Sequence, residues 1–252
     1  MTAVALSRMT RPPSSRFGRR CIGPCALVVA LTVILGSFPA VAASTAKAVR
    51  ISGTVWYYKR GCYADTTRTL TPVPNAFVQL VRGTKSTTWP LNANGRFRAS
   101  LSGTGSTYGY LLLNGPRLAV SPNSSGAKPY RIPLGWVKAG ANAFKLSGNG
   151  PAGAANIWTV VSMGQNFAAS VSPVRIPPLK VAWRENANLA AGSPFDGTDD
   201  TYFDGANNTL MVDGGGNRQD QWEPFVLLHE YGHLVLTTIE TLPEFQADGD
   251  HT

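Results

Sequence analysis

The sequence predicts an α+β protein of two domains, an antiparallel β-sandwich followed by a smaller α+β domain with a long apolar helix. Three observations predict this. Between residues 49 and 146, short runs of alternating apolar and polar residues are separated by Gly, Pro and Asn, as is typical of strands and turns. Beyond this point, apolar residues recur at helical spacing. The charge also changes, because residues 44–147 carry 14 Lys and Arg against one acidic residue, whereas residues 148–252 carry 4 against 13.

The first 43 residues have the order of a secretory signal peptide. A segment with five arginines and no acidic residue precedes an apolar run at residues 26–38, and the small-residue stretch AVAAS follows. The apolar run is about 13 residues long, fewer than the ~20 that a membrane-spanning helix needs. We therefore expect export and cleavage, which give a secreted protein without a stable membrane anchor. The Sec and twin-arginine routes both stay open.

Six runs in the first domain, residues 44–147, are predicted as strands because each alternates or is rich in apolar residues between turn residues. In chain order they are VRISGTVWYY, NAFVQLVRG, NGRFRASL, YGYLLLNG, PYRIPLG and NAFKLSG. Strands at this spacing, without a helical period, predict an antiparallel sandwich of about 100 residues.

The segments SGTVWYY, TPVPNAFVQLVRG and LNANGRFRASL resemble, in this order, the transthyretin-like, carboxypeptidase-regulatory-like family of β-sandwiches. The resemblance covers residues 50–101 and implies an accessory module without catalytic residues. The positive charge of this domain allows contact with an anionic cell-surface polymer, and a scattered solvated surface accounts for it equally well. The basic residues lack the clustered Arg and aromatic pattern of nucleic-acid binding, so we expect no nucleic-acid partner.

The second domain, residues 148–252, is predicted to hold one helix, two strands and a loop before its long apolar helix. SGNGPAG, at residues 147–153, has the composition of a linker. Apolar residues from Ile157 to Phe167 lie at helical spacing. LKVAW and TLMVD are predicted as strands. The stretch SPFDGTDDTYFDGANN between them is predicted as a solvated loop, since its spacing does not match a calcium-binding loop.

The stretch PFVLLHEYGHLVL, residues 224–236, carries two of the chain's three histidines four residues apart. A helix is expected to begin near Asp220. On this helix His229 and His233 lie one turn apart, where two imidazole nitrogens can converge on one ion. Zinc accepts neutral imidazole nitrogen, and a catalytic zinc site has three protein ligands and a water. Glu230 can reach that water as a general base, so the H-E-x-x-H spacing predicts zinc as the cofactor of a hydrolase.

With the segments PPLKVAW, NTLMVDGG and DQWEPFVLLHEYGHLV, this half of the chain resembles the zinc metallopeptidases of the gluzincin type. The resemblance is strongest to exported bacterial ones that carry such a β-sandwich in front. It implies that His229 and His233 are zinc ligands, that Glu230 is the catalytic glutamate and that the substrate is a peptide or protein. It also implies that the strand near Met211 is the sheet edge along which an extended peptide adds.

A third zinc ligand is not identified in the sequence. Gluzincins supply a glutamate from a second helix further along the chain, and no second helical pattern follows His233. The remaining candidates lie in a stretch that resembles a loop: Glu240, Glu244, Asp248 and His251. We therefore expect the second domain to be the N-terminal part of a longer metallopeptidase domain of the zincin type, to which gluzincins belong, with the third ligand outside this chain.

Two functions from different classes stay open. The first is a secreted zinc-dependent peptidase in which Glu230 acts as general base. The alternative is a non-catalytic exported binding protein, whose basic β-sandwich attaches to an anionic cell-surface polymer and whose zincin half is vestigial. The missing ligand and the charge difference between the two domains favour the alternative, and the histidine spacing favours the peptidase.

Overall fold

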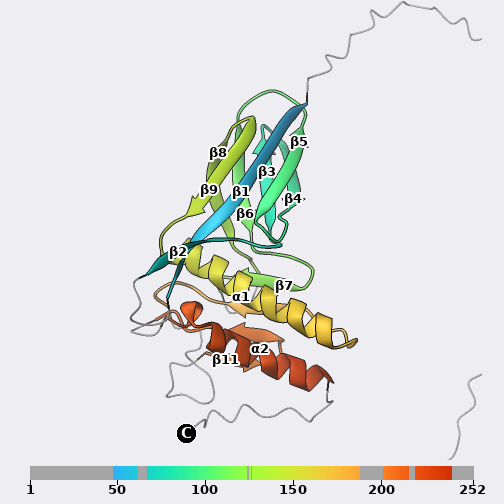
Figure 1. The fold of residues 1–252 in the computed structure, drawn as a ribbon, viewed down its shortest axis with the longest axis vertical. Helices are drawn as coiled ribbons and strands as arrows, with labels where there is room; N and C mark the ends of the chain where they lie inside the picture. Colours follow the sequence, from blue (N-terminus) through green and yellow to red (C-terminus); the bar gives the residue numbers. More distant parts are fainter. Residues whose placement is uncertain are drawn as a thin grey trace, which may run out of the picture. The chain divides into compact units, whose positions relative to one another are not determined.

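Most of the alternating runs in the sequence form strands in the structure, a computed structural model (Figure 1). The structure describes residues 48–61, 67–123, 125, 127–187, 201–215 and 219–239. The strands in this part of the chain are β1 (Val49–Arg60), β2 (Arg68–Pro72), β3 (Phe77–Arg82), β4 (Lys85–Pro90), β5 (Arg96–Leu101), β6 (Thr107–Leu112), β7 (Leu118–Ser121), β8 (Arg131–Val137), β9 (Gly140–Leu146), β10 (Leu179–Ala182), β11 (Tyr202–Asp204) and β12 (Thr209–Met211). The helices are α1 (Asn149–Val171), α2 (Pro224–Ile239) and the short 3-10 turn η1 (Asp220–Trp222).

Two four-stranded sheets contain eight of the first nine strands. β1 pairs antiparallel with β5 along its first half and with β2 along its second half, while β9 pairs with it in parallel. The other sheet has the order β4-β3-β6-β8 and is antiparallel throughout. Alternate residues of β1, such as Ile51, Val55 and Tyr57, are buried in a core that both sheets share.

The six predicted strands are confirmed, but the pairing of β9 departs from the antiparallel arrangement that the sequence predicts. β9 follows β8, which belongs to the other sheet, so it enters the sheet of β1 by a crossover instead of a hairpin. A hairpin would have made it antiparallel to its neighbour.

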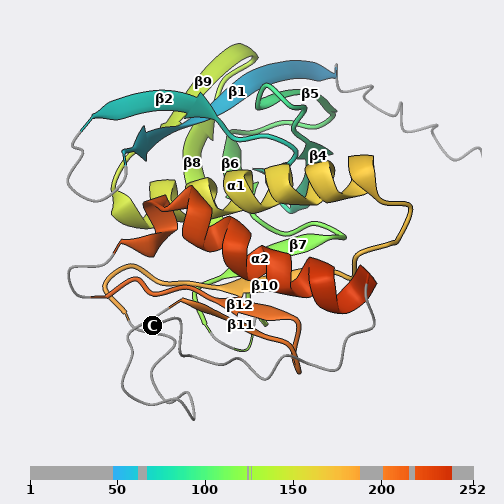
Figure 2. The same cartoon turned by 60° about the horizontal axis from the view of Figure 1, so that its bottom comes forward.

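The third sheet, with the order β11-β12-β10-β7, joins segments that lie far apart in the chain. β7 is parallel to β10, β10 is parallel to β12, and β11 is antiparallel to β12. α1 packs against β1, β7 and α2 (Figure 2). Every residue from Ala152 to Trp158 is buried, as expected for a helix with neighbours on several sides. The two predicted halves of the chain therefore share one sheet and one central helix, and the described residues belong to one compact unit.

The predicted linker at residues 147–153 is wrong, because α1 begins at Asn149. Pro151 is tolerated there, since an N–H in the first turn has no partner within the helix. A Cβ at Gly153 would lie 2.6 Å from Cη2 of Trp183, so this glycine permits close packing of α1 on the end of β10. The residues with a linker-like composition therefore form the tightly packed start of a helix. The helix predicted after them is confirmed.

The stretch predicted as an Asp- and Gly-rich loop contributes a strand, β11. Phe203 is buried and pairs with Leu210 of β12, and this contact with a distant segment overrides the turn-like composition. Residues 193–200 of the stretch lie outside the described residues. The predicted sheet edge near Met211 is also wrong, because β12 lies between β10 and β11, and the edge strands of this sheet are β11 and β7.

The protein is therefore of mixed α+β class and rich in β-structure, with three sheets and two α-helices in the described residues. Neither of these helices is long and apolar enough to cross a membrane. The signal peptide predicted for residues 1–43 lies outside the described residues.

Candidate metal centre

The candidate ligands lie on α2, which is held against α1 by one apolar face. Leu227, Tyr231 and Leu234, spaced by four and three residues, are buried. At Gly164 of α1, a Cβ would lie 2.8 Å from Cδ2 of Leu228 and 3.0 Å from Cδ1 of Tyr231. The glycine thus lets the two helices approach closely, and the exposed positions of α2 are His229 and three apolar residues, Phe225, Leu236 and Ile239.

The start of α2 differs slightly from the predicted start near Asp220. Residues Asp220–Trp222 form η1, Glu223 is extended, and the α-helix begins at Pro224. A proline disfavours helical backbone in the residue before it, so the chain straightens at Glu223. The helical assignment itself is confirmed, and α2 is described as far as Ile239.

The structure brings the three predicted site residues together. The ring centroids of His229 and His233 are 5.0 Å apart, with the rings at 87°. Nε2 of His233 lies 3.9 Å from Oε2 of Glu230. One ligand atom from each of the three residues lies within 4.8 Å of the others, so the group can hold a metal ion.

The exposure of these side chains suits a metal that substrate can reach. His229 is exposed, the side chain of His233 is 34% exposed, and that of Glu230 is 11% exposed. Two accessible imidazoles are ligands that zinc takes readily, although a catalytic zinc has three protein ligands. Within the described ranges, no further His, Cys, Asp or Glu joins this group. The candidates Glu240, Glu244, Asp248 and His251 all lie outside those ranges.

The buried environment of Glu230 disfavours its charged form. Burial raises the pKa of Glu230 from 4.5 to about 7, and a hydrogen bond from the backbone N–H of Phe203 opposes part of this rise. Phe203 belongs to β11, and α2 packs against this strand. The edge strand therefore contacts the carboxylate that the sequence assigns as general base. A bound cation would lower this pKa again, because it favours the charged carboxylate.

Hydrogen bonds from distant segments fix the turn that leads into α2. Oγ1 of Thr201 donates to Oδ2 of Asp220 at 2.7 Å, and the backbone N–H of Asp213 donates to the same threonine oxygen at 3.0 Å. These bonds tie the turn to the ends of β11 and β12. They set where α2 begins and, through it, the position of the histidines.

Asn156 provides a second anchor that the sequence does not reveal. It is fully buried in α1, where its Nδ2 donates to the backbone carbonyl of Gln221 at 2.6 Å. The hydroxyl of Tyr57 in β1 donates to its Oδ1 at 3.0 Å. One amide thus joins β1, α1 and η1. The only signal in the sequence is a lone polar residue in an otherwise apolar stretch of helix.

Comparison with known proteins identifies no relative by sequence. No family model matches the chain, and no curated protein matches it. Among solved structures, a protein from Bacteroides uniformis named for carbohydrate binding is 12% identical with a TM-score of 0.22, over 38% of this chain and 40% of that one. The major plantain pollen allergen Pla l 1 is 12% identical with a TM-score of 0.21, over 39% of this chain and 94% of that one. At these TM-scores the likeness identifies neither a shared fold nor a shared function.

Proposed function

We propose that this chain is a secreted zinc-dependent peptidase, or the metal-binding part of one, with Glu230 as its general base. The observation that carries the proposal is that His229, Glu230 and His233 each place a possible ligand atom within 4.8 Å of the others, with the glutamate buried beside the two histidines. The spacing alone predicts that the two histidines lie on one face. The structure adds that the helix is packed on its other face and that the glutamate is buried beside them.

In the proposed reaction each residue has a distinct role. His229 and His233 hold zinc through their imidazole nitrogens. A bound zinc ion supplies Lewis acidity, which lowers the pKa of water and polarises a carbonyl. Glu230 takes one proton from the water whose oxygen attacks the carbonyl carbon of the peptide bond. It then returns this proton to the amide nitrogen as the C–N bond breaks.

β11 is the proposed place for an extended substrate. It is one of the two edge strands of its sheet, β7 being the other, and its only strand partner in the described part of the chain is β12. An extended peptide that adds to this edge gains main-chain hydrogen bonds and lies beside α2. The contact between Phe203 and Glu230 supports this choice, because it puts the edge next to the base.

The finer fold assignment forms part of the same proposal. We infer that the sheets of β1 and β3 form the accessory sandwich of the carboxypeptidase-regulatory-like type. The third sheet, with α1 and α2 beside it, is the proposed zincin-like part. The H-E-x-x-H helix and an edge strand that runs antiparallel to the rest of its sheet support this assignment.

The test is hydrolysis of casein by the full chain, with zinc content measured on the same samples. We expect activity that disappears when a chelator removes zinc and returns when zinc is added. His229→Ala should lose both zinc and activity, whereas Met163→Ala, at an exposed position of α1, should keep both. A wild-type protein that binds zinc and hydrolyses no peptide or protein would contradict the proposal and favour the non-catalytic binding protein.

A further inference from the structure

Two arginines face each other where β1 ends and β2 begins. Arg60 is directly opposite Arg68 in the antiparallel register of these strands. Like charges at such positions destabilise a strand pair unless an opposite charge lies between them. Among the described residues, no carboxylate forms an ion pair with either arginine. The pair is therefore a concentrated positive charge that the described protein does not neutralise.

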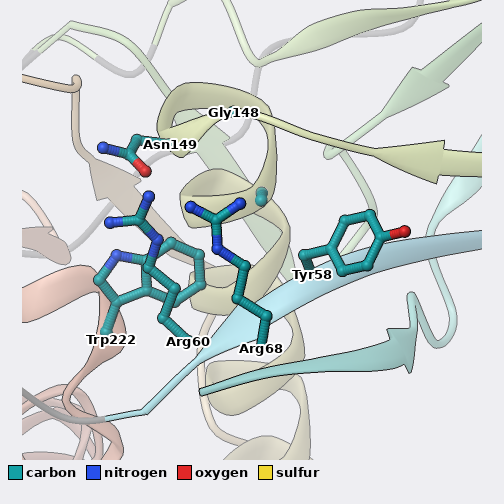
Figure 3. Close-up of a pocket in the computed structure, with 7 residues that line it drawn as sticks. Tyr58, Arg60, Arg68, Gly148, Asn149 and Trp222 are labelled. Atoms are coloured by element: carbon teal, nitrogen blue, oxygen red, sulfur yellow. The ribbon is translucent and has the colours of Figure 1, made fainter. Parts of the chain in front are cut away.

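The two arginines line a shallow pocket with residues from α1 and η1. Its lining is Tyr58, Arg60, Arg68, Gly148, Asn149, Ala152 and Trp222. Figure 3 shows both guanidinium groups directed toward the start of α1, with the indole of Trp222 beside Arg60. The guanidinium carbon of Arg60 lies 5.9 Å from the centroid of the indole, which is itself almost fully buried. This packing restricts Arg60 and leaves its N–H groups available to the pocket.

The start of α1 adds further donors to the same place. Gly148 provides no side-chain cap, and the first turn of α1 contains no acidic residue. The first backbone N–H groups of a helix have no partner within it, so they favour an anion. Oδ1 of Asn149 is buried and makes no hydrogen bond with the described residues, and Figure 3 shows it on the side of the Arg60 guanidinium. One carboxylate is already close to this turn, because Oε2 of Glu185 lies 2.9 Å from the position of a Cβ at Gly150, but Glu185 does not line the pocket.

We propose that this pocket binds a phosphate group that carries two negative charges. Two guanidinium forks and a helix start approach from different sides, and a tetrahedral anion has enough oxygens to accept from all of them. A planar carboxylate has only two oxygens, and the N–H groups of a single guanidinium are enough to bind both. Two arginines without a carboxylate partner among the described residues also favour a dianion, such as inorganic phosphate or a phosphate monoester, over a phosphodiester with a single charge. The site is separate from the metal centre and does not depend on the proposed peptidase activity.

The test is calorimetric titration of the full chain with inorganic phosphate at low salt and about pH 8, where phosphate is mainly dianionic. We expect saturable binding of one phosphate. Arg60→Gln and Arg68→Gln should each weaken it about tenfold or more, because each removes charged hydrogen bonds. Arg98→Gln removes the same charge from an exposed position of β5 that does not line the pocket, so it should bind like the wild type.

Acetate, a melting curve and lipid vesicles complete the test of the pocket. Equal phosphate binding by all three variants, or acetate binding as tight as phosphate binding, would overturn the proposal.

In phosphate-free buffer Arg68→Gln should melt no lower than the wild type, because the change relieves repulsion between Arg60 and Arg68. A clearly lower melting temperature would contradict this repulsion. Vesicles that contain phosphatidic acid identify a lipid source of the phosphate group if inorganic phosphate displaces them. Vesicle binding that phosphate does not displace would count against the pocket.

Discussion

Replacing Glu230 by glutamine in the metal-free protein should change how stability depends on pH. Burial raises the pKa of Glu230 from 4.5 to about 7 in the folded protein, so the folded state binds this proton more tightly than the unfolded state. For an acid with a raised pKa, stability is highest below the unfolded pKa. It falls as the pH rises from 4.5 to about 7 and is then constant, because both states are ionised.

The size of this effect follows from the shift. The rise in the pKa of Glu230 corresponds to a loss of about 3 kcal/mol of stability between acidic and alkaline pH. The residue is only 8% exposed, so solvent screens little of the effect. Glu230→Gln has the same shape and cannot ionise. It should therefore match the wild type near pH 4 and be more stable by about 3 kcal/mol near pH 8.

The assay is urea denaturation of chelator-treated protein at several pH values. The wild type and Glu230→Gln are compared with Met163→Ala, a change at an exposed position of α1 that alters no ionisable group. The Met163 variant should follow the wild-type profile. A constant difference between the wild type and Glu230→Gln at every pH would refute the reasoning, because it would show that Glu230 does not titrate differently in the folded state.

Three further changes test the packing that positions the site. Gly153→Ala should lower the free energy of unfolding in urea by roughly 1–3 kcal/mol, because its Cβ meets a buried tryptophan. Gly232→Ala on α2 should raise it by roughly 0.5–1 kcal/mol, because the Cβ there meets no atom within 4 Å. Asn156→Ala should lower the free energy of unfolding by roughly 1–3 kcal/mol, again measured in urea, because it removes the partner of a carbonyl of η1 and one partner of the hydroxyl of Tyr57. Gly164→Leu should push α2 away from α1, and competition with a coloured chelator should then show weaker zinc binding than in Gly232→Ala.

The strands that the sequence reveals are those with one buried face. In β5 every second residue is buried, and the alternation is visible in RFRASL. β2 and β4 are not predicted, because RTLTP and KSTTWP expose nearly all of their side chains and leave no apolar period. β7 is also missed. Its four residues pair with β10, which follows the whole of α1, and no local pattern carries that information.

In the candidate site, too, some features follow from the local sequence and others depend on contacts with distant segments. The positions of His229 and His233 follow from helical spacing, which is a local property of the sequence. The contact between Phe203 and Glu230 and the anchor at Asn156 join segments that are distant in the chain, so they appear only in the folded structure. The raised pKa of Glu230 belongs to this second group, because burial by other elements causes it.

The most direct test of the central claim is the rate at which zinc-loaded Glu230→Gln hydrolyses casein. Zinc content is measured on the same sample. The expected result is zinc content equal to that of the wild type and a rate lower by about 100-fold or more, since the variant keeps both histidines and lacks the base. Glu230→Gln that retains zinc and the full wild-type rate would contradict the role of Glu230 and the proposed function with it.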